Sequence, residues 1–203
     1  MLPSTPWGNA MFGKKQDFQP DRPRSGLLSK LYLTPKQRLS LLKWGLYSVL
    51  LVLLSVVQDV LLCRMHVFGA TTELVPCGIL MICLAEGMEY GSIFSLVAAC
   101  AYLFSGSSAG YHTIVLMPLL SVLLTYFRQS LLRKSFFATM LCTIVGVMAY
   151  ELLSFLFCVI FNITRLDRIM VPVITGLLTL IAAPMLYPMI RGISTLGGEA
   201  WKE

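Results

Sequence analysis

Long apolar runs constrain the fold of this chain more than any other feature of its sequence. A helix needs about 20 apolar residues to cross a hydrocarbon core of about 30 Å. The run 44–63 has this length, the run 136–161 is interrupted only by Glu151, and the run 170–190 carries no charge. Because 57% of the residues are hydrophobic and only 13% are charged, a soluble domain would lack its polar shell. The sequence therefore predicts an all-α integral membrane protein.

Three further helices are expected between these runs, which gives a predicted bundle of six transmembrane helices. Residues 91–127 contain no Asp, Glu, Lys or Arg, and this stretch suits two helices that reverse near 105–111. The preceding helix, 67–85, is divided by Glu73 and Pro76. It could be a short span or half of a re-entrant hairpin.

The polar segments predict the domain boundaries and the orientation. Residues 1–34 are expected to form a basic, largely disordered cytoplasmic tail, because they offer little apolar surface to bury. The Thr-Pro-Lys-Gln pattern at 34–37 predicts a helix start. The transmembrane domain is expected at 35–191, followed by a cytoplasmic tail at 192–203. Most of the 16 Lys and Arg residues then lie on one side, which predicts both termini in the cytoplasm.

The net charge of +6 indicates contact with anionic lipid. Lys30, Lys36, Arg38 and Lys43 lie near the start of the first helix. Each cation near an anionic inner leaflet contributes about 1 kcal/mol. The tail has neither a dense basic run nor interleaved aromatic residues, so the sequence does not favour a nucleic acid partner.

The stretch 106–110, Gly-Ser-Ser-Ala-Gly, matches the G-x-S-x-G pattern of many hydrolases, with Ser108 in the nucleophile position and His112 close behind. That pattern works on a strand-to-helix turn, whereas these residues are predicted between two helices. Gly and Ser are common in turns for conformational reasons alone. We therefore expect no catalytic residue here. His112 could cap a helix, pair with a carboxylate or contact a partner.

The six cysteines and two histidines show no recognisable metal or disulfide pattern. No C-x-x-C pair occurs, and the cysteines lie in or beside apolar runs, where they act as small apolar residues. Neither His66 nor His112 belongs to an H-E-x-x-H arrangement. The sequence therefore predicts no metal and no cofactor.

Glu151 is the strongest functional candidate, since a carboxylate at the bilayer centre costs at least about 2.5 kcal/mol. It shares one side of its predicted helix with small and polar residues, namely Thr139, Cys142, Thr143, Gly146, Tyr150 and Ser154. Such a strip lets helices approach and hydrogen-bond. Glu151 could hold helices together, contact a partner or ligand, or handle protons or ions.

Three more charged residues are candidates for buried polar or partner contacts. Asp59 is expected near the external end of the first helix, where it could reach lipid headgroups. Glu86 is expected at the turn between the second and third helices, either solvated or paired with a basic residue of the same membrane side such as Arg128.

The order of these features resembles the MreD family of bacterial rod shape-determining membrane proteins. The resemblance covers about 44–190 and rests on a proline opening the second helix, glycines at the next turn, a Gly-aromatic-His start to the fourth helix, a basic loop and a glutamate in the fifth (Pro76, Gly87, Gly91, Gly110, Tyr111, His112, Arg128, Arg133, Lys134 and Glu151). Many relatives carry an aspartate just before the Ser/Gly turn, where this chain has Tyr102, Leu103 and Phe104. No role of that aspartate carries over.

This resemblance implies a non-catalytic part of the cell-elongation machinery in the bacterial cytoplasmic membrane. The implied partners are an MreC-like bitopic protein and, through it, an MreB-like actin homologue and peptidoglycan synthases. Family members are similar in architecture to the substrate-binding subunits of energy-coupling-factor vitamin transporters, which supply the alternative function. Those subunits usually dock through Ala-x-x-x-Ala on their first helix, and 44–63 contains no alanine, which favours the shape protein.

Overall fold

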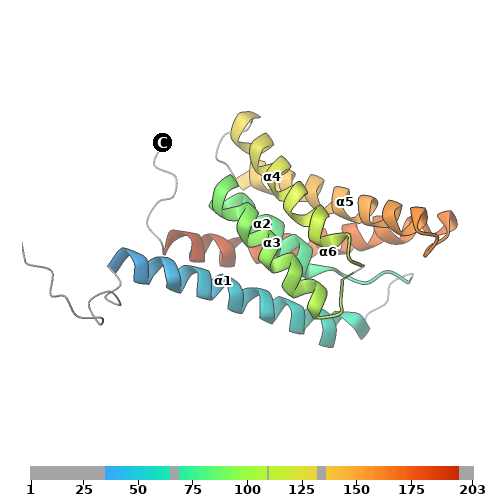
Figure 1. Cartoon of the computed structure of the whole chain (residues 1–203), viewed down its shortest axis with the longest axis horizontal. Coiled ribbons are helices and arrows are strands. Elements are labelled where there is room, and N and C mark those ends of the chain that lie inside the picture. Colours follow the sequence, from blue (N-terminus) through green and yellow to red (C-terminus); the bar gives the residue numbers. More distant parts are fainter. Residues whose placement is uncertain (1–34, 65–68, 109, 132–135, 197–203) are drawn as a thin grey trace, which may run out of the picture. The chain divides into compact units, whose positions relative to one another are not determined.

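The computed structural model describes residues 35–64, 69–108, 110–131 and 136–196. Six α-helices make up most of this part, and no strand occurs within it (Figure 1). They are α1 (Pro35–Val60), α2 (Leu74–Glu86), α3 (Met88–Phe104), α4 (Thr113–Leu131), α5 (Phe136–Ile160) and α6 (Met170–Thr195), with single 3₁₀ turns at Leu62–Arg64 and Leu166–Arg168. The prediction of an all-α bundle of six helices is confirmed.

Some sequence predictions lie outside the described residues. These are the tail at 1–34, the end of the chain from 197, and the side chains of His66, Arg133 and Lys134.

Four helical segments are long and apolar enough to cross a membrane, namely Gln37–Val60, Thr113–Ser130, Phe136–Ile160 and Leu166–Thr195. The chain is therefore a multi-pass membrane protein. The other two helices, α2 and α3, are shorter. With 13 residues at about 1.5 Å each, α2 rises about 20 Å, which is less than a hydrocarbon core of about 30 Å.

The helix ends follow local signals in most places. Helix α1 occupies the described residues from Pro35 onward, and Thr34, the predicted cap, lies outside the described residues. The chain reverses between Phe104 and Thr113, as the Ser/Gly-rich turn predicts. Helix α6 extends to Thr195, beyond the end of the apolar run at 190.

Helix α2 is the centre of the bundle. It packs against all five other helices, and every one of its residues except Ala85 is buried. The cause is visible in its sequence, which is apolar on all sides up to its last residue, Glu86. A helix with no polar face has no side to turn toward water.

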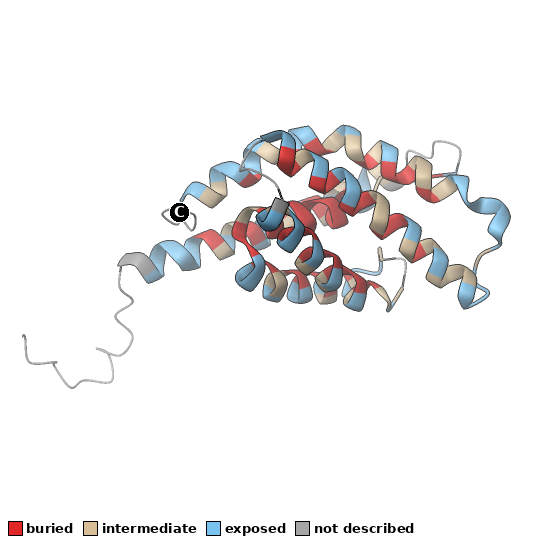
Figure 2. Cartoon of the chain, turned by 90° about the horizontal axis from the view of Figure 1, so that it is seen from above, coloured by how far each residue is buried: buried red, intermediate tan, exposed pale blue. Residues whose placement is uncertain are grey.

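The other helices are buried only on the side that faces this centre (Figure 2). Their outward faces expose large apolar side chains, for example Val49 and Val52 on α1 and Ile181 and Met185 on α6. In water such faces would be unfavourable, whereas in hydrocarbon they cost nothing. The exterior therefore fits lipid as its solvent.

Helices α2 and α3 reverse through a single residue, Gly87, whose φ of 94° lies in the region that favours glycine. The Gly87 N–H donates to the carbonyl of Cys83 at 3.0 Å. The Cys83 thiol donates to the carbonyl of Gly91 at 3.1 Å. A Cβ atom on Gly91 would lie 3.0 Å from both Cα and O of Cys83, so the absence of a side chain is what lets the two helices pack here.

Candidate functional site

The carboxyl end of α2 is held by a buried ion pair. Lys43 Nζ of α1 lies 2.6 Å from Glu86 Oε2, and the Tyr47 hydroxyl donates to Glu86 Oε1 at 2.6 Å. Lys43 and Glu86 are each only 6% exposed. Because Lys43 and Tyr47 are one helical turn apart, both reach the same carboxylate.

Glu86 is a buried polar residue, as its place among the candidates anticipated, and of the two alternatives left open for it the solvated turn is wrong. Its basic partner is Lys43 and not Arg128. Lys43 itself is buried in the bundle and does not extend to lipid headgroups. The sequence could not show this pairing, because it depends on how α1 packs against α2.

Arg128 reaches the same end of α2 by another route. Its guanidinium donates to the carbonyl of Leu84, one of the last carbonyls of a helix, which have no partner within the helix. A cation at this end also complements the helix dipole. Arg128 thus ties α4 to α2 as a C-terminal cap.

A second polar network joins the opposite end of α2 to the Ser/Gly turn. Gln58 accepts a hydrogen bond from the Val75 N–H at 3.0 Å and donates to the Tyr102 hydroxyl at 3.1 Å. Tyr102 in turn approaches the carbonyl of Ser107 at 3.2 Å. The Ser107 hydroxyl donates to Asp59 Oδ1 at 2.7 Å. Asp59 of α1 is therefore hydrogen-bonded to the turn between α3 and α4.

Substitution of the two serines in the turn, Ser107 and Ser108, tests whether the turn is structural or catalytic. Ser108→Ala is expected to change the free energy of unfolding by less than about 0.5 kcal/mol, because no contact of its hydroxyl with the described residues supports the turn. Ser107→Ala is expected to cost about 1 kcal/mol through the lost bond to Asp59. Thermal unfolding of the purified variants measures both. Loss of function without loss of stability in Ser108→Ala would restore the nucleophile interpretation.

His112 lies at the start of α4 and joins it to α5. Its Nε2 is 2.7 Å from the Ser154 hydroxyl, and its ring stacks on Phe157 with centroids 5.5 Å apart. Partial burial lowers the pKa of His112 from its ordinary value, which favours the neutral ring. Among the described residues, the His112 side chain neither caps a helix nor pairs with a carboxylate. Its partner there is the Ser154 hydroxyl.

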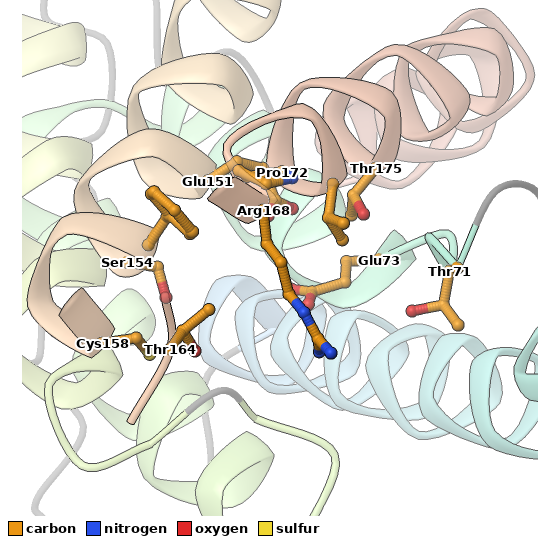
Figure 3. Close-up of a pocket in the computed structure, with 12 residues that line it drawn as sticks. Thr71, Glu73, Glu151, Ser154, Cys158, Thr164, Arg168, Pro172 and Thr175 are labelled. Atoms are coloured by element: carbon orange, nitrogen blue, oxygen red, sulfur yellow. The ribbon is translucent and has the colours of Figure 1, made fainter. Parts of the chain in front are cut away.

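A pocket of about 290 Å³ opens beside Ser154 (Figure 3). The segment before α2, helix α5, the loop after it and the start of α6 supply its lining, which consists of Gly69, Thr71, Glu73, Glu151, Ser154, Phe155, Cys158, Thr164, Arg168, Val171, Pro172 and Thr175. Two carboxyl groups, Glu73 and Glu151, and one guanidinium, Arg168, therefore line one hollow.

Glu151 is buried in the wall of this pocket, with 6% of its surface exposed. Its Oε1 atom has no hydrogen-bond partner among the described residues. Gly176 of α6 faces it, and a Cβ atom there would lie 3.7 Å from the Glu151 side chain. The polar strip predicted on α5 is buried as expected, but its glutamate faces a pocket and is not bonded to a neighbouring helix through Oε1.

Glu73 was not among the predicted site residues, but the structure places it in the lining of this pocket. Its N–H donates to the Thr179 hydroxyl at 3.0 Å, which fixes the backbone. Its Oε2 is 3.5 Å from the Tyr102 hydroxyl, the limit of a hydrogen bond. Burial raises the pKa of the Glu73 carboxyl above its ordinary value. The signal available in the sequence was a glutamate directly before an entirely apolar helix.

Within the described ranges, no three His, Cys, Asp or Glu residues are grouped so that they could hold a metal ion. Five cysteines are free thiols, namely Cys77, Cys83, Cys100, Cys142 and Cys158. The acidic pair in the pocket therefore lacks the usual third ligand of a metal site.

Comparisons with known proteins give no relative. No family model matches the chain, and neither a curated protein nor a solved structure is similar to it. The likeness to energy-coupling-factor subunits stays a prediction.

Proposed function

We propose that this protein is a non-catalytic membrane component of the bacterial cell-elongation machinery, of the kind that the MreD family represents. It would help to position peptidoglycan synthesis by binding an MreC-like bitopic protein and, through it, an MreB-like actin homologue and peptidoglycan synthases. Its place would be the cytoplasmic membrane, with both termini in the cytoplasm. In this orientation the Lys43–Glu86 pair lies on the cytoplasmic side and the pocket faces outward.

The observation that carries this proposal is the ordered series of motif residues and their places in the helices. Pro76 lies in the first turn of α2, where proline is tolerated. Gly87 forms the reversal into α3, and His112 directly precedes α4. Pro76, Gly87 and His112 thus each have a structural reason at their positions, and this supports the proposal.

The contacts that polar side chains make between helices also support an assembly role. Lys43 and Glu86 join α1 to α2, Arg128 joins α4 to α2, and His112 joins α4 to α5. These contacts fix helices to one another, as a protein that serves as an assembly platform requires. The outward apolar faces leave room for the single transmembrane helix of a bitopic partner to pack.

Depletion of the protein tests the proposal. We expect a rod-shaped host to become round within a few generations, because side-wall synthesis would lose its membrane organiser, while uptake of trace vitamins stays unchanged. Microscopy and uptake of labelled vitamin measure the two effects, and re-expression of the wild-type chain is the control. Intact rods with failed uptake would contradict the shape function and favour the transporter subunit.

A further inference from the structure

The pocket contains hydrogen-bonding capacity that the described protein does not use. Glu151 is more than nine-tenths buried, its Oε1 is unpartnered, and it lines the hollow. Glu73 lines the same hollow; it is half-buried, and its carboxyl accepts only a long hydrogen bond, of 3.5 Å, from the Tyr102 hydroxyl. Buried polar groups in native proteins almost always have partners. An unpartnered buried oxygen of Glu151 and a weakly bonded carboxyl of Glu73 at one opening indicate a missing donor.

We propose that the pocket binds a small zwitterion whose primary ammonium group is received by Glu151 and Glu73 and whose anionic group is received by Arg168. Phosphoethanolamine has this chemistry, either as a free molecule or as the headgroup of phosphatidylethanolamine. The inference does not depend on the proposed function, because it rests on the pocket alone.

An ammonium group fits the acidic side of the pocket better than a metal ion does. It brings three donors, and two carboxyl groups supply matching acceptors. The described residues provide no third acidic, histidine or cysteine ligand, which most protein metal sites require. The nearby Arg168 would also repel a free cation, whereas it complements a zwitterion.

Arg168 gives the site its second charge. It is exposed and lines the pocket from the loop between α5 and α6, while the two glutamates come from α5 and from the segment before α2 (Figure 3). A guanidinium binds phosphate and carboxylate groups with paired hydrogen bonds. The two charges of a zwitterion thus have separate places in one hollow.

The volume of the pocket limits the ligand to a small one. Sites for drug-sized molecules occupy about 300–1,000 Å³, and this pocket measures about 290 Å³. A headgroup fills such a space, and the side chains of Phe155 and Val171 supply apolar contacts for its carbon atoms. The acyl chains of a lipid would remain outside, against the apolar exterior of the bundle.

The experiment uses the full chain, purified in detergent and freed of lipid. Four probes are added in turn: phosphatidylethanolamine, phosphatidylglycerol with the same acyl chains, O-phosphoethanolamine and ethanolamine. Native mass spectrometry detects bound lipid, and the ligand-dependent rise in melting temperature gives the affinity. We expect phosphatidylethanolamine to bind and phosphatidylglycerol, which lacks the ammonium group, not to bind.

The free probes identify the source of the ligand. Binding of O-phosphoethanolamine in addition to the lipid would show that a free zwitterion suffices, and binding of phosphatidylethanolamine alone would show that the lipid is required. Both results support the ammonium site. Equal binding of the two lipids, or binding of no probe, would overturn it.

Substitutions at Glu151 test whether charge is what the site uses. Glu151→Gln and Glu151→Leu are both expected to weaken binding about tenfold or more, the loss expected for a charge-assisted hydrogen bond. Glu89→Gln, on the exposed first turn of α3, is the control and should bind normally. A Gln variant that binds as well as the wild type would overturn the proposal. The melting temperature without ligand reports folding separately.

Substitution of Arg168 tests whether the pocket also binds the anionic group of the zwitterion. Arg168→Gln should weaken O-phosphoethanolamine about tenfold and leave the weaker binding of ethanolamine unchanged, because ethanolamine has no phosphate. Arg165→Gln is the matched control, since Arg165 is exposed in the same loop and does not line the pocket. Equal losses in the two arginine variants would contradict a specific role for Arg168.

Discussion

Glu86→Leu is expected to lower the free energy of unfolding by about 3–5 kcal/mol, because removal of one partner leaves a buried charge without compensation. The charge in question is the Lys43 ammonium, whose Nζ is 2.6 Å from Glu86 Oε2 in the wild type. The Tyr47 hydroxyl would lose its acceptor at the same time. Unfolding of the purified variant in detergent micelles measures the effect.

The control for this variant is Glu89→Leu, which removes a carboxylate of the same type from an exposed position nearby. Its effect should stay within about 0.5 kcal/mol. A comparable loss in both variants would mean that the burial of Glu86 is not the cause.

A double variant separates the ion pair from the packing around it. Lys43→Met combined with Glu86→Leu replaces both charges with apolar groups of similar volume, and such replacements are often neutral. We therefore expect the double variant to recover most of the stability that Glu86→Leu loses. Additive losses in the double variant would contradict a pairwise interaction.

Gly91→Val is expected to give the second large loss. Even a Cβ atom at this position would lie 3.0 Å from the Cα and O atoms of Cys83, and backbone atoms cannot turn aside as a side chain can. Overpacking of this kind costs about 1–3 kcal/mol, so Gly91→Ala should fall in that range and Gly91→Val should exceed it. Helices α2 and α3 would have to separate, which would also break the bond from Cys83 to Gly91.

Gly45→Ala is the matched control for Gly91. Gly45 also lies inside a helix, but a Cβ atom there meets nothing within 4 Å. Alanine should therefore be neutral or stabilise the protein by up to about 1 kcal/mol, because it restricts the unfolded chain and favours the helix. Thermal unfolding of both variants makes the comparison. If the two alanine variants lost equal stability, the close contact of α2 and α3 would not be the reason.

The sequence predicts the helices because their signals are local. The apolar runs give the number of helices, and the Ser/Gly-rich stretch gives the reversal between α3 and α4. The burial of Glu151 also follows from its position in an apolar run with small and polar neighbours. Each of these inferences needs only a short window of the chain.

The pairing of side chains across the bundle could not be predicted in the same way. Lys43 looks like any cation near a membrane surface until α1 is packed against α2. Gln58 and Tyr102 have no pattern that distinguishes them, yet they connect the turn to the amino end of α2. Glu73 enters the pocket with Glu151 only through the path of the chain before α2. Such contacts depend on the register between helices, which a single sequence does not contain.

The position of α2 also imposes an order on biosynthesis. Its two ends are held by Gln58 and Arg128, and Glu73 just before it is held by Thr179 of α6. The ribosome synthesises α2 before α4 and α6, so two of these three side chains do not yet exist when α2 emerges. Nascent α2 must therefore wait in a partly assembled bundle until α6 is complete. In a chain released before Thr179 is made, the segment before α2 would lack its hydrogen bond to α6. We expect such a chain to be degraded by membrane quality control.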